Sequence, residues 1–431
     1  GRVEVVQLGM RSSAVPTVVF LTEAGDLLTG DAANRRAVTA PGRVAREFKR
    51  RVGDTAPLLL GGTPMAPQAL MGTMLRWVLD QVATERGEAA DHVAVSHPAN
   101  WGPYKLDLLH QAVRLADQES VTTITEPEAA ARYYSSTRRL APGEIVAVYD
   151  LGGGTFDAAV VQATDAGFEI LGIPEGIEHL GGIDVDEAVF GFVARSLDGA
   201  LDELDLDDPI VTAAAARLRR DCVEAKEALS SDAEVIVPVL LPNIQTEVRI
   251  TRDELESLIR PSLVATIGAL ERALRSADVT ADDLAAVLLV GGASRMPLVA
   301  ELVGEALGRP VAVDAHPKHA VSLGTALAAE AAHLGAQGLR QPTAEIVAPI
   351  TARPAEPSDP PPADTPPPVN PRSTVVTPTP TPPPVGPPDT AVPPVTPAPT
   401  GRDTISAPVP TPPPVGDADA DATAAAAFGA P

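Results

Sequence analysis

Two hydrophobic periods alternate along the chain up to about residue 335. Short apolar runs rich in β-branched residues predict buried strands, and longer segments in which apolar residues return every three or four positions predict amphipathic helices. Strands are predicted over residues 3–7, 18–21, 92–96, 144–149, 156–162, 168–174, 234–240, 246–250 and 285–289. Helices are predicted over residues 66–85, 104–116, 184–196, 210–229, 253–274, 297–307 and 319–333. This alternation predicts an α/β fold.

The pattern stops after about Gly338, where proline begins to dominate. Of the 45 prolines, 28 lie between Gln341 and Pro431, and Thr-Pro-Pro-Pro-Val occurs three times, at residues 365, 381 and 411. Such a composition forms no packed core and populates solvated polyproline II. We therefore expect a disordered tail over residues 337–431. It would act as a semi-rigid spacer or as a ligand for the aromatic grooves of protein partners.

Charge and composition exclude several classes of partner. The formal net charge is −24, so no basic stripe is available for nucleic acid or an anionic membrane. No apolar run reaches the roughly 18 to 20 residues that span a bilayer. The single cysteine, Cys222, excludes an intramolecular disulfide framework and favours a reducing, cytoplasmic location. Because Cys222 falls in a predicted helix, we expect a buried thiol rather than a nucleophile.

The run Asp150-Leu-Gly-Gly-Gly-Thr-Phe-Asp157 is the strongest chemical signal. Three glycines allow backbone N–H groups to approach anionic oxygens closely. The two aspartates repel phosphate unless a divalent cation, usually Mg²⁺ with retained waters, lies between carboxylate and phosphate oxygens. A tight hairpin turn between two strands is the alternative explanation of the glycines. The flanking carboxylates and Thr155 favour a phosphate site.

Three further segments carry polar groups at element ends. Lys49 lies in the basic run Phe48-Lys-Arg-Arg-Val-Gly53, which could equally be a solvated surface. Glu126 follows a predicted strand and precedes a helix that would begin at Pro127, an arrangement that helix-start chemistry also explains. The third segment, Leu288-Leu-Val-Gly-Gly-Ala-Ser-Arg-Met-Pro297, is a buried strand that ends in two glycines before a helix. A helix N-terminus favours phosphate, and an arginine can stack on a base.

In this order and spacing, the segments resemble the ATPase domain of the heat-shock protein 70 family, within the actin and sugar-kinase superfamily. His179-Leu-Gly-Gly-Ile-Asp184 matches a further segment of that family. The resemblance implies a two-lobed actin-like ATPase with ribonuclease-H-like lobes. The nucleotide-binding domain would span residues 1–336, with lobe I over about 1–149, lobe II over about 150–310 and a returning helix to about 336.

The resemblance also implies roles for individual residues. Catalytic positions would be Lys49, Glu126, Asp150 and Thr155. Nucleotide contacts would come from Gly152, Gly153, Gly154, Gly181, Gly182, Lys226, Gly291, Gly292, Ser294 and Arg295. Mg²⁺ would be held by Asp150 and Asp157 through waters and supported by Glu126. The cofactors implied are ATP or ADP and Mg²⁺.

The chain departs from the family pattern at several positions. Val223 stands where the family has a glutamate near adenosine, Glu227 where a basic residue is frequent, and Lys318 where an aspartate lies near the cleft. The family's opening Asp-Leu-Gly-Thr-Thr hairpin has no counterpart here, and its loss would weaken hydrolysis severely if the native protein also lacks it. The hydrophobic linker, peptide clamp and helical lid have none either, so this chain is not expected to hold unfolded peptides.

The leading hypothesis is Mg²⁺-dependent ATP binding with slow hydrolysis, as a chaperone-family nucleotide switch without the peptide clamp. A non-catalytic nucleotide-gated scaffold is the alternative, motivated by the substitutions above. A small-molecule kinase of the same superfamily is a third hypothesis, although no sugar-recognition motif stands out. His316 and His319 lie one helical turn apart, and no metal site is expected there because too few ligands converge.

Overall fold

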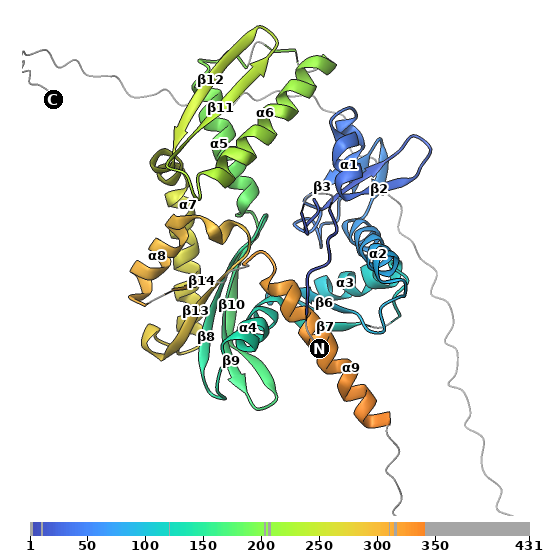
Figure 1. Cartoon of the computed structure of the whole chain (residues 1–431), viewed down its shortest axis with the longest axis vertical. Coiled ribbons are helices and arrows are strands. Elements are labelled where there is room, and N and C mark those ends of the chain that lie inside the picture. Colours follow the sequence, from blue (N-terminus) through green and yellow to red (C-terminus); the bar gives the residue numbers. More distant parts are fainter. Residues whose placement is uncertain are drawn as a thin grey trace, which may run out of the picture. The chain divides into compact units, whose positions relative to one another are not determined.

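The computed structural model describes the backbone of residues 3–9, 12–119, 121–201, 204–205, 208–309, 311–313 and 317–340. Contacts divide the chain into a compact unit, Gly1–Val347, and a second unit, Ala348–Pro431. The proline-rich repeats and His316 lie outside the described residues. All elements discussed below belong to the first unit (Figure 1).

A five-stranded sheet with the order β10-β9-β8-β13-β14 forms the centre of the unit. Strand β13 pairs in parallel with both β8 and β14, whereas β9 pairs antiparallel with β8 and β10. The strands are β8 (Ile145–Leu151), β9 (Phe156–Thr164), β10 (Gly167–Ile177), β13 (Leu284–Val290) and β14 (Val311–Val313). Almost all residues of β8 and β13 are apolar because helices cover both faces of the sheet.

The alternation along β8 sends successive side chains into two separate cores. Val146 and Val148 pack with residues of α4 (Glu126–Thr137) and α9 (Ala320–Arg340). Ala147 and Tyr149 face the opposite way, toward a larger core. That core is built on helices α5 (Gly182–Arg195), α6 (Pro209–Ala228), α7 (Arg252–Ser276) and α8 (Pro297–Leu307).

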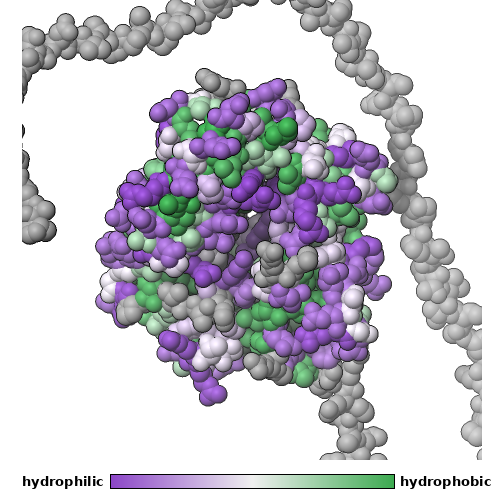
Figure 2. All heavy atoms as spheres, turned by 45° about the horizontal axis from the view of Figure 1, so that its top comes forward, coloured by the Kyte–Doolittle hydropathy of each residue, from purple (hydrophilic) through white to green (hydrophobic). Residues whose placement is uncertain are grey.

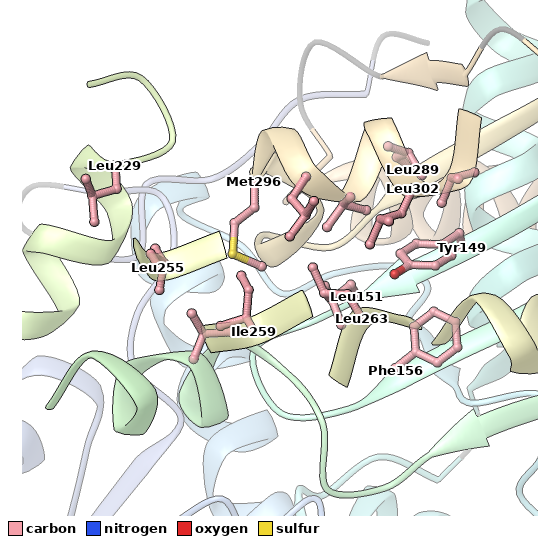
Figure 3. Close-up of a cluster of buried hydrophobic side chains, with 14 of the residues drawn as sticks. Tyr149, Leu151, Phe156, Leu229, Leu255, Ile259, Leu263, Leu289, Met296 and Leu302 are labelled. Carbon is pink, nitrogen blue, oxygen red and sulfur yellow. The ribbon is translucent and has the colours of Figure 1, made fainter. Parts of the chain in front are cut away.

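Tyr149 is a fully buried member of the larger core (Figure 3). Its ring lies 4.6 Å from the ring of Phe156, centroid to centroid, and its hydroxyl is 2.6 Å from Thr266 Oγ1. Since Thr266 donates its own proton to the Leu263 carbonyl, the tyrosine is the donor of this bond. Burial raises the pKa of Tyr149 to about 12, although the bond to Thr266 opposes the shift.

Helix starts follow local sequence closely. Thr251 accepts a hydrogen bond from the backbone N–H of Glu254, whose carboxylate accepts one from the N–H of Thr251, so a complete capping box starts α7. Thr125 and Glu128 form the same box at α4. Helix α4 therefore begins at Glu126, with Pro127 in its second position, one residue earlier than predicted.

The described residues before α4 form smaller sheets and three α-helices. A three-stranded antiparallel sheet has the order β2-β1-β3, and two further pairs are β4 with β5 and β6 with β7. The strands are β1 (Val18–Leu21), β2 (Leu27–Thr29), β3 (Val44–Arg46), β4 (Leu58–Leu60), β5 (Thr63–Met65), β6 (Ala94–His97) and β7 (Thr122–Thr125). The helices are α1 (Gly30–Ala37), α2 (Pro67–Arg86) and α3 (Pro103–Leu115).

Two more features complete the unit. Strands β11 (Glu234–Leu241) and β12 (Ile244–Thr251) form an antiparallel hairpin beside α6. Helix α9 packs beside α4 and contacts β6 and β7, all of which precede the central sheet in the sequence (Figure 1). A side chain at Gly324 of α9 would overlap the Ala129 carbonyl, so a glycine permits this close approach.

The strand predicted over residues 3–7 is wrong. Residues 3–9 pair with no other strand among those described, and Val5 is 41% exposed. Strand β1 is already paired on both sides, by β2 and β3. The short strands β2 to β5 and β14 were not predicted because three residues show no period. No helix among the described residues is long and apolar enough to cross a bilayer.

Candidate functional site

A large cleft of about 900 Å³ opens between the turn after β3 and the loops that follow β8 and β13 (Figure 2). The carboxyl ends of neighbouring parallel strands β8 and β13 meet at its floor, which is where open α/β sheets bind ligands. Most of the sequence-predicted site residues line it. They are Lys49, Glu126, Asp150, Gly152, Gly153, Gly154, Thr155, Gly182, Lys226, Gly291, Gly292 and Arg295.

Three predicted residues lie elsewhere. Asp157 borders a smaller neighbouring cavity that also touches Lys49 and Thr155. Gly181 lies beneath the cleft wall, where a Cβ atom would be 2.6 Å from the backbone nitrogen of Gly154. Ser294 is 2% exposed, and its hydroxyl accepts from the N–H of Leu151 and donates to the Val290 carbonyl. Its hydroxyl thus ties the loop after β13 to the end of β8.

The glycine run is both a hairpin turn and a cradle. Strands β8 and β9 pair up to Leu151 and Phe156, and the N–H of Gly152 closes the turn on the Thr155 carbonyl at 2.9 Å. Within the described residues, no acceptor is present for the N–H groups of Gly153 and Gly154. The two explanations of the sequence therefore describe one structure. The turn leaves donors free for an anionic ligand.

The start of α5 is hydrogen-bonded to this turn. The N–H of Gly182 donates to the Gly152 carbonyl at 3.0 Å, and the N–H of Ile183 donates to the Gly153 carbonyl at 2.8 Å. Gly291, in the left-handed region at φ 86°, approaches Asp150 so closely that a Cβ would lie 2.5 Å from its Oδ1. Glycines are needed here because three loops converge without room for side chains.

The carboxylates of Asp150, Asp157 and Glu126 lie close enough to repel one another. Burial, followed by the charges of Glu126 and Asp157, raises the pKa of Asp150 to about 7. Burial and Glu126 likewise raise the pKa of Asp157 to about 6, and Lys49 opposes both shifts. A cation would relieve this repulsion, so the donor set fits a hard divalent ion such as Mg²⁺. No three His, Cys, Asp or Glu side chains in the described chain converge enough to bind a metal directly, so waters and ligand oxygens would complete its shell.

Lys49 faces these carboxylates from the turn after β3. Its Nζ donates to Glu126 Oε1 at 2.8 Å; the lysine side chain is 42% exposed and the glutamate side chain 12%. Burial lowers the pKa of Lys49, but Glu126, Asp157 and Asp150 together more than offset it, so the net shift is upward. The ammonium group stays charged and presents a cation to the cleft.

Sequence reasoning gave no site role to Asn100 or Asp186. The Asn100 amide donates to Asp157 Oδ1 at 3.2 Å; its position just after the carboxyl end of β6 was a usable signal. Asp186 Oδ1 lies 2.6 Å from Lys226 Nζ, which also donates to the Gly182 carbonyl at 3.2 Å. Lys226 is thus held against α5 rather than extended into solvent. Asp186 follows Asp184 by two residues, and nothing in this spacing indicated a role in the site.

Comparison with known proteins places this geometry in a family. A family model described as Hsp70 protein matches residues 58–349, more than half of the chain. The chain belongs to the Hsp70 family. This confirms the resemblance inferred from the motifs, and the mixed α/β architecture agrees with the predicted actin-like fold.

Curated members of the Hsp70 family show a similar extent of match. The chaperone protein DnaK of Thermotoga petrophila is 30% identical over 336 residues, which is 76% of this chain and 56% of that protein. DnaK of Methanothermobacter thermautotrophicus is 30% identical over 323 residues, 72% of this chain and 52% of that protein. DnaK of Thermosipho melanesiensis is 28% identical over 344 residues, 78% of this chain and 57% of that protein. The chain spans about half the length of these relatives.

Proposed function

We propose that the chain binds ATP with Mg²⁺ in the cleft and hydrolyses it slowly, as a chaperone-family nucleotide switch. One observation carries the proposal: the glycine turn with the unpaired N–H groups of Gly153 and Gly154, the Lys49 ammonium and the half-buried carboxylates of Asp150 and Asp157 line one cleft and the small cavity beside it. That arrangement supplies donors for phosphate and carboxylates for a cation in one place. Membership of the Hsp70 family supports the nucleotide as the ligand.

The residues divide the work by chemistry. Gly153 and Gly154 would donate to phosphate oxygens, and Asp150 and Asp157 would hold the waters of the ion. Bound Mg²⁺ would supply neutralisation of the phosphate charge. Lys49 would orient the attacking water and stabilise charge on the transferred phosphoryl group, and Glu126 keeps the lysine aimed at that point. Phosphoryl transfer needs little beyond such positioning and electrostatics.

The adenosine end of the proposed site is assembled from other elements. Arg295, at the end of the short 3-10 turn Ala293–Arg295 after β13, lines the cleft together with Glu227 of α6 and Ser230 just after that helix. A guanidinium can stack on the base, whereas Lys226 would reach the ribose only on leaving Asp186 or by using its remaining donors. We propose that Gly292 permits the close approach of the sugar and phosphate, because nothing lies within 4 Å of the position of its absent Cβ.

The organisation of the whole chain is part of the proposal. We propose lobe I over about residues 1–149 and lobe II over about 150–310, with the cleft between them and α9 returning to the first lobe. The proline-rich tail over 337–431 would tether the protein or dock partners with aromatic grooves. The single cysteine of the chain, Cys222, favours a reducing compartment, and we propose that the protein acts in the cytoplasm.

Calorimetry of the purified chain with ATP, with and without Mg²⁺, tests the proposal. We expect binding that strengthens with Mg²⁺ and weakens in excess EDTA, and single-turnover release of phosphate that Lys49→Ala slows by about 100-fold or more. The neighbouring Arg51→Ala variant is the control, because that side chain pairs with Asp54 in its own turn. Absence of Mg²⁺-dependent binding at millimolar nucleotide would contradict the proposal.

A non-catalytic nucleotide-gated scaffold is the second candidate. It is favoured by the ion pair that holds Lys226 against Asp186 and by Lys318 at the cleft wall, where the family pattern has an aspartate. The same calorimetry separates the two candidates when it is combined with turnover. A scaffold would bind nucleotide and release no phosphate in a single turnover, whereas an ATPase would release phosphate in a Lys49-dependent way.

A further inference from the structure

Arg50, the residue after Lys49, reaches across the cleft. Its side chain is only 10% exposed, and each of its three nitrogens has a partner. Nε donates to the Gly154 carbonyl at 2.6 Å, and Nη2 donates to Asp184 Oδ2 at 2.7 Å. Nη1 donates to Glu47 Oε2 at 3.0 Å, within the turn that carries Arg50. One guanidinium thus joins three separate segments.

Its neighbour Arg51 provides an internal contrast. Arg51 is 39% exposed and pairs with Asp54 three residues on, so its ion pair stays inside one turn. Surface pairs of this kind contribute little to stability. Sequence alone does not distinguish the two arginines, since they are adjacent and carry the same charge. Only the fold directs one of them toward the glycine turn.

Two acceptors of Arg50 belong to the glycine turn and to the start of α5. Asp184 Oδ2 also accepts from the N–H of Gly181 at 2.7 Å, which closes the first turn of α5. Gly154 lies in the turn that lines the cleft, and a Cβ there would be 3.0 Å from Arg50 Nε. A glycine therefore provides the space for the guanidinium. Arg50 therefore contacts both the glycine turn and the start of α5.

We propose that Arg50 is a positioning residue that fastens the glycine turn and the start of α5 to the segment that carries Lys49. Because Lys49 and Arg50 are adjacent, the three bonds of Arg50 also set where the lysine ammonium lies relative to the free N–H groups. A planar guanidinium suits this role, since its fork satisfies a carbonyl and two carboxylates together. A lysine has the charge but not the fork. The kinetic part of this inference rests on the proposed ATPase function.

The fastening is tested first without nucleotide. Spin labels are attached at Glu23→Cys, in the exposed turn between β1 and β2, and at Glu247→Cys, an exposed position of β12. Pulsed electron resonance then reports the distance between the sheet that contains β1 and the hairpin that contains β12. Cys222, with no exposed surface, stays unlabelled. We expect Arg50→Met to broaden the distance distribution and Arg50→Lys to restore it only in part, whereas Arg51→Met leaves it unchanged. Equal distributions in the Arg50 and Arg51 variants would overturn the proposal.

Turnover then separates positioning from folding. All variants are first compared by thermal unfolding, and Arg50→Lys keeps the test available where Arg50→Met unfolds. We expect Arg50→Lys to lower kcat about tenfold or more with a smaller change in KM, the effect of one charge-assisted bond expressed in the transition state. Asp184→Asn combined with Arg50→Lys should cost no more than either change alone. A fall confined to KM, or fully additive effects, would contradict the positioning role.

The two proposals fail in distinguishable ways. If the wild-type chain bound no nucleotide, the proposed ATPase function would fall, while the distance distributions of the nucleotide-free variants would still decide whether Arg50 fastens the cradle. Normal ATP turnover by Arg50→Met would leave the ATPase function intact and remove the role assigned to Arg50.

Discussion

Lys49 and Glu126 lie 77 positions apart in the chain, and the lysine Nζ donates to the glutamate Oε1 at 2.8 Å. The contact joins the turn after β3 to the first residue of α4, near the half-buried aspartates Asp150 and Asp157. Burial raises the pKa values of Asp150 and Asp157, the charge of Glu126 adds to both shifts, and Glu126 also helps to keep Lys49 charged. The pair therefore determines how charge is distributed across the proposed phosphate site.

Lys49→Ala should lower single-turnover hydrolysis by about 100-fold or more, the usual effect of removing a group that stabilises transition-state charge. ATP affinity should change much less, because the turn N–H groups and the cation sites remain. Rapid-quench measurement of phosphate release and calorimetric affinity check both expectations. Thr155→Ala should show the same split. A parallel loss of affinity and rate in both variants would argue against the assigned roles.

Gly291→Ala should destabilise the protein by about 2–4 kcal/mol, since the new Cβ would lie against Asp150 and the backbone of Leu151 at a positive φ. The adjacent Gly292→Ala is a matched control, with open space at the Cβ position and an ordinary φ of −66°. Urea unfolding of the two variants measures the difference. Similar midpoints would show that the loops do not approach as closely as described.

Tyr149→Phe should cost about 1–2 kcal/mol, because the ring is kept and the hydrogen bond to buried Thr266 is lost. Tyr104→Phe is the control, with a side chain that is 62% exposed. Denaturant unfolding with an unchanged m-value would attribute the loss to stability alone. A cost no larger than that of Tyr104→Phe would indicate that the buried hydroxyl adds nothing.

Alkaline pH should weaken the folded state through Cys222. Burial, with the charge of Asp221 adding to it, raises the pKa of this thiol from 9.0 to about 12. Between these values the unfolded chain loses the thiol proton and the folded chain keeps it, so stability falls as pH rises, by about 1.4 kcal/mol per unit. Cys222→Ala lacks this contribution.

Unfolding free energies at pH 8 and pH 10 check the prediction. The decline between them should be smaller in Cys222→Ala than in the wild type. In the folded protein at pH 8 the thiol should react with iodoacetamide far more slowly than in urea, because it is buried and neutral. Fast alkylation of the folded chain would contradict both statements.

Much of the fold could be predicted from the sequence where a segment is long and periodic. Helix α8 and strand β1 have the bounds predicted for them, and most other predicted helices and the long strands shift by a few residues at their ends. Helix α9 is the exception, because it runs on to Arg340 although its predicted end was residue 333. Short strands such as β4 escaped prediction because three residues carry no period. Residues 3–7 misled because an apolar run forms a strand only by pairing with another strand, and this segment pairs with none among the described residues.

The site divides in the same way. The run from Asp150 to Asp157 determined its own turn, because glycines between two strands leave few other conformations and expose N–H groups locally. Which side chains surround that turn was decided by tertiary structure alone. The buried position of Ser294, the ion pair of Lys226 with Asp186 and the choice of Arg50 over Arg51 all depend on segments far apart in sequence. Burial, charge pairing and directed hydrogen bonds act only after those segments pack, so the sequence determined the chemistry available and the fold decided which residues use it.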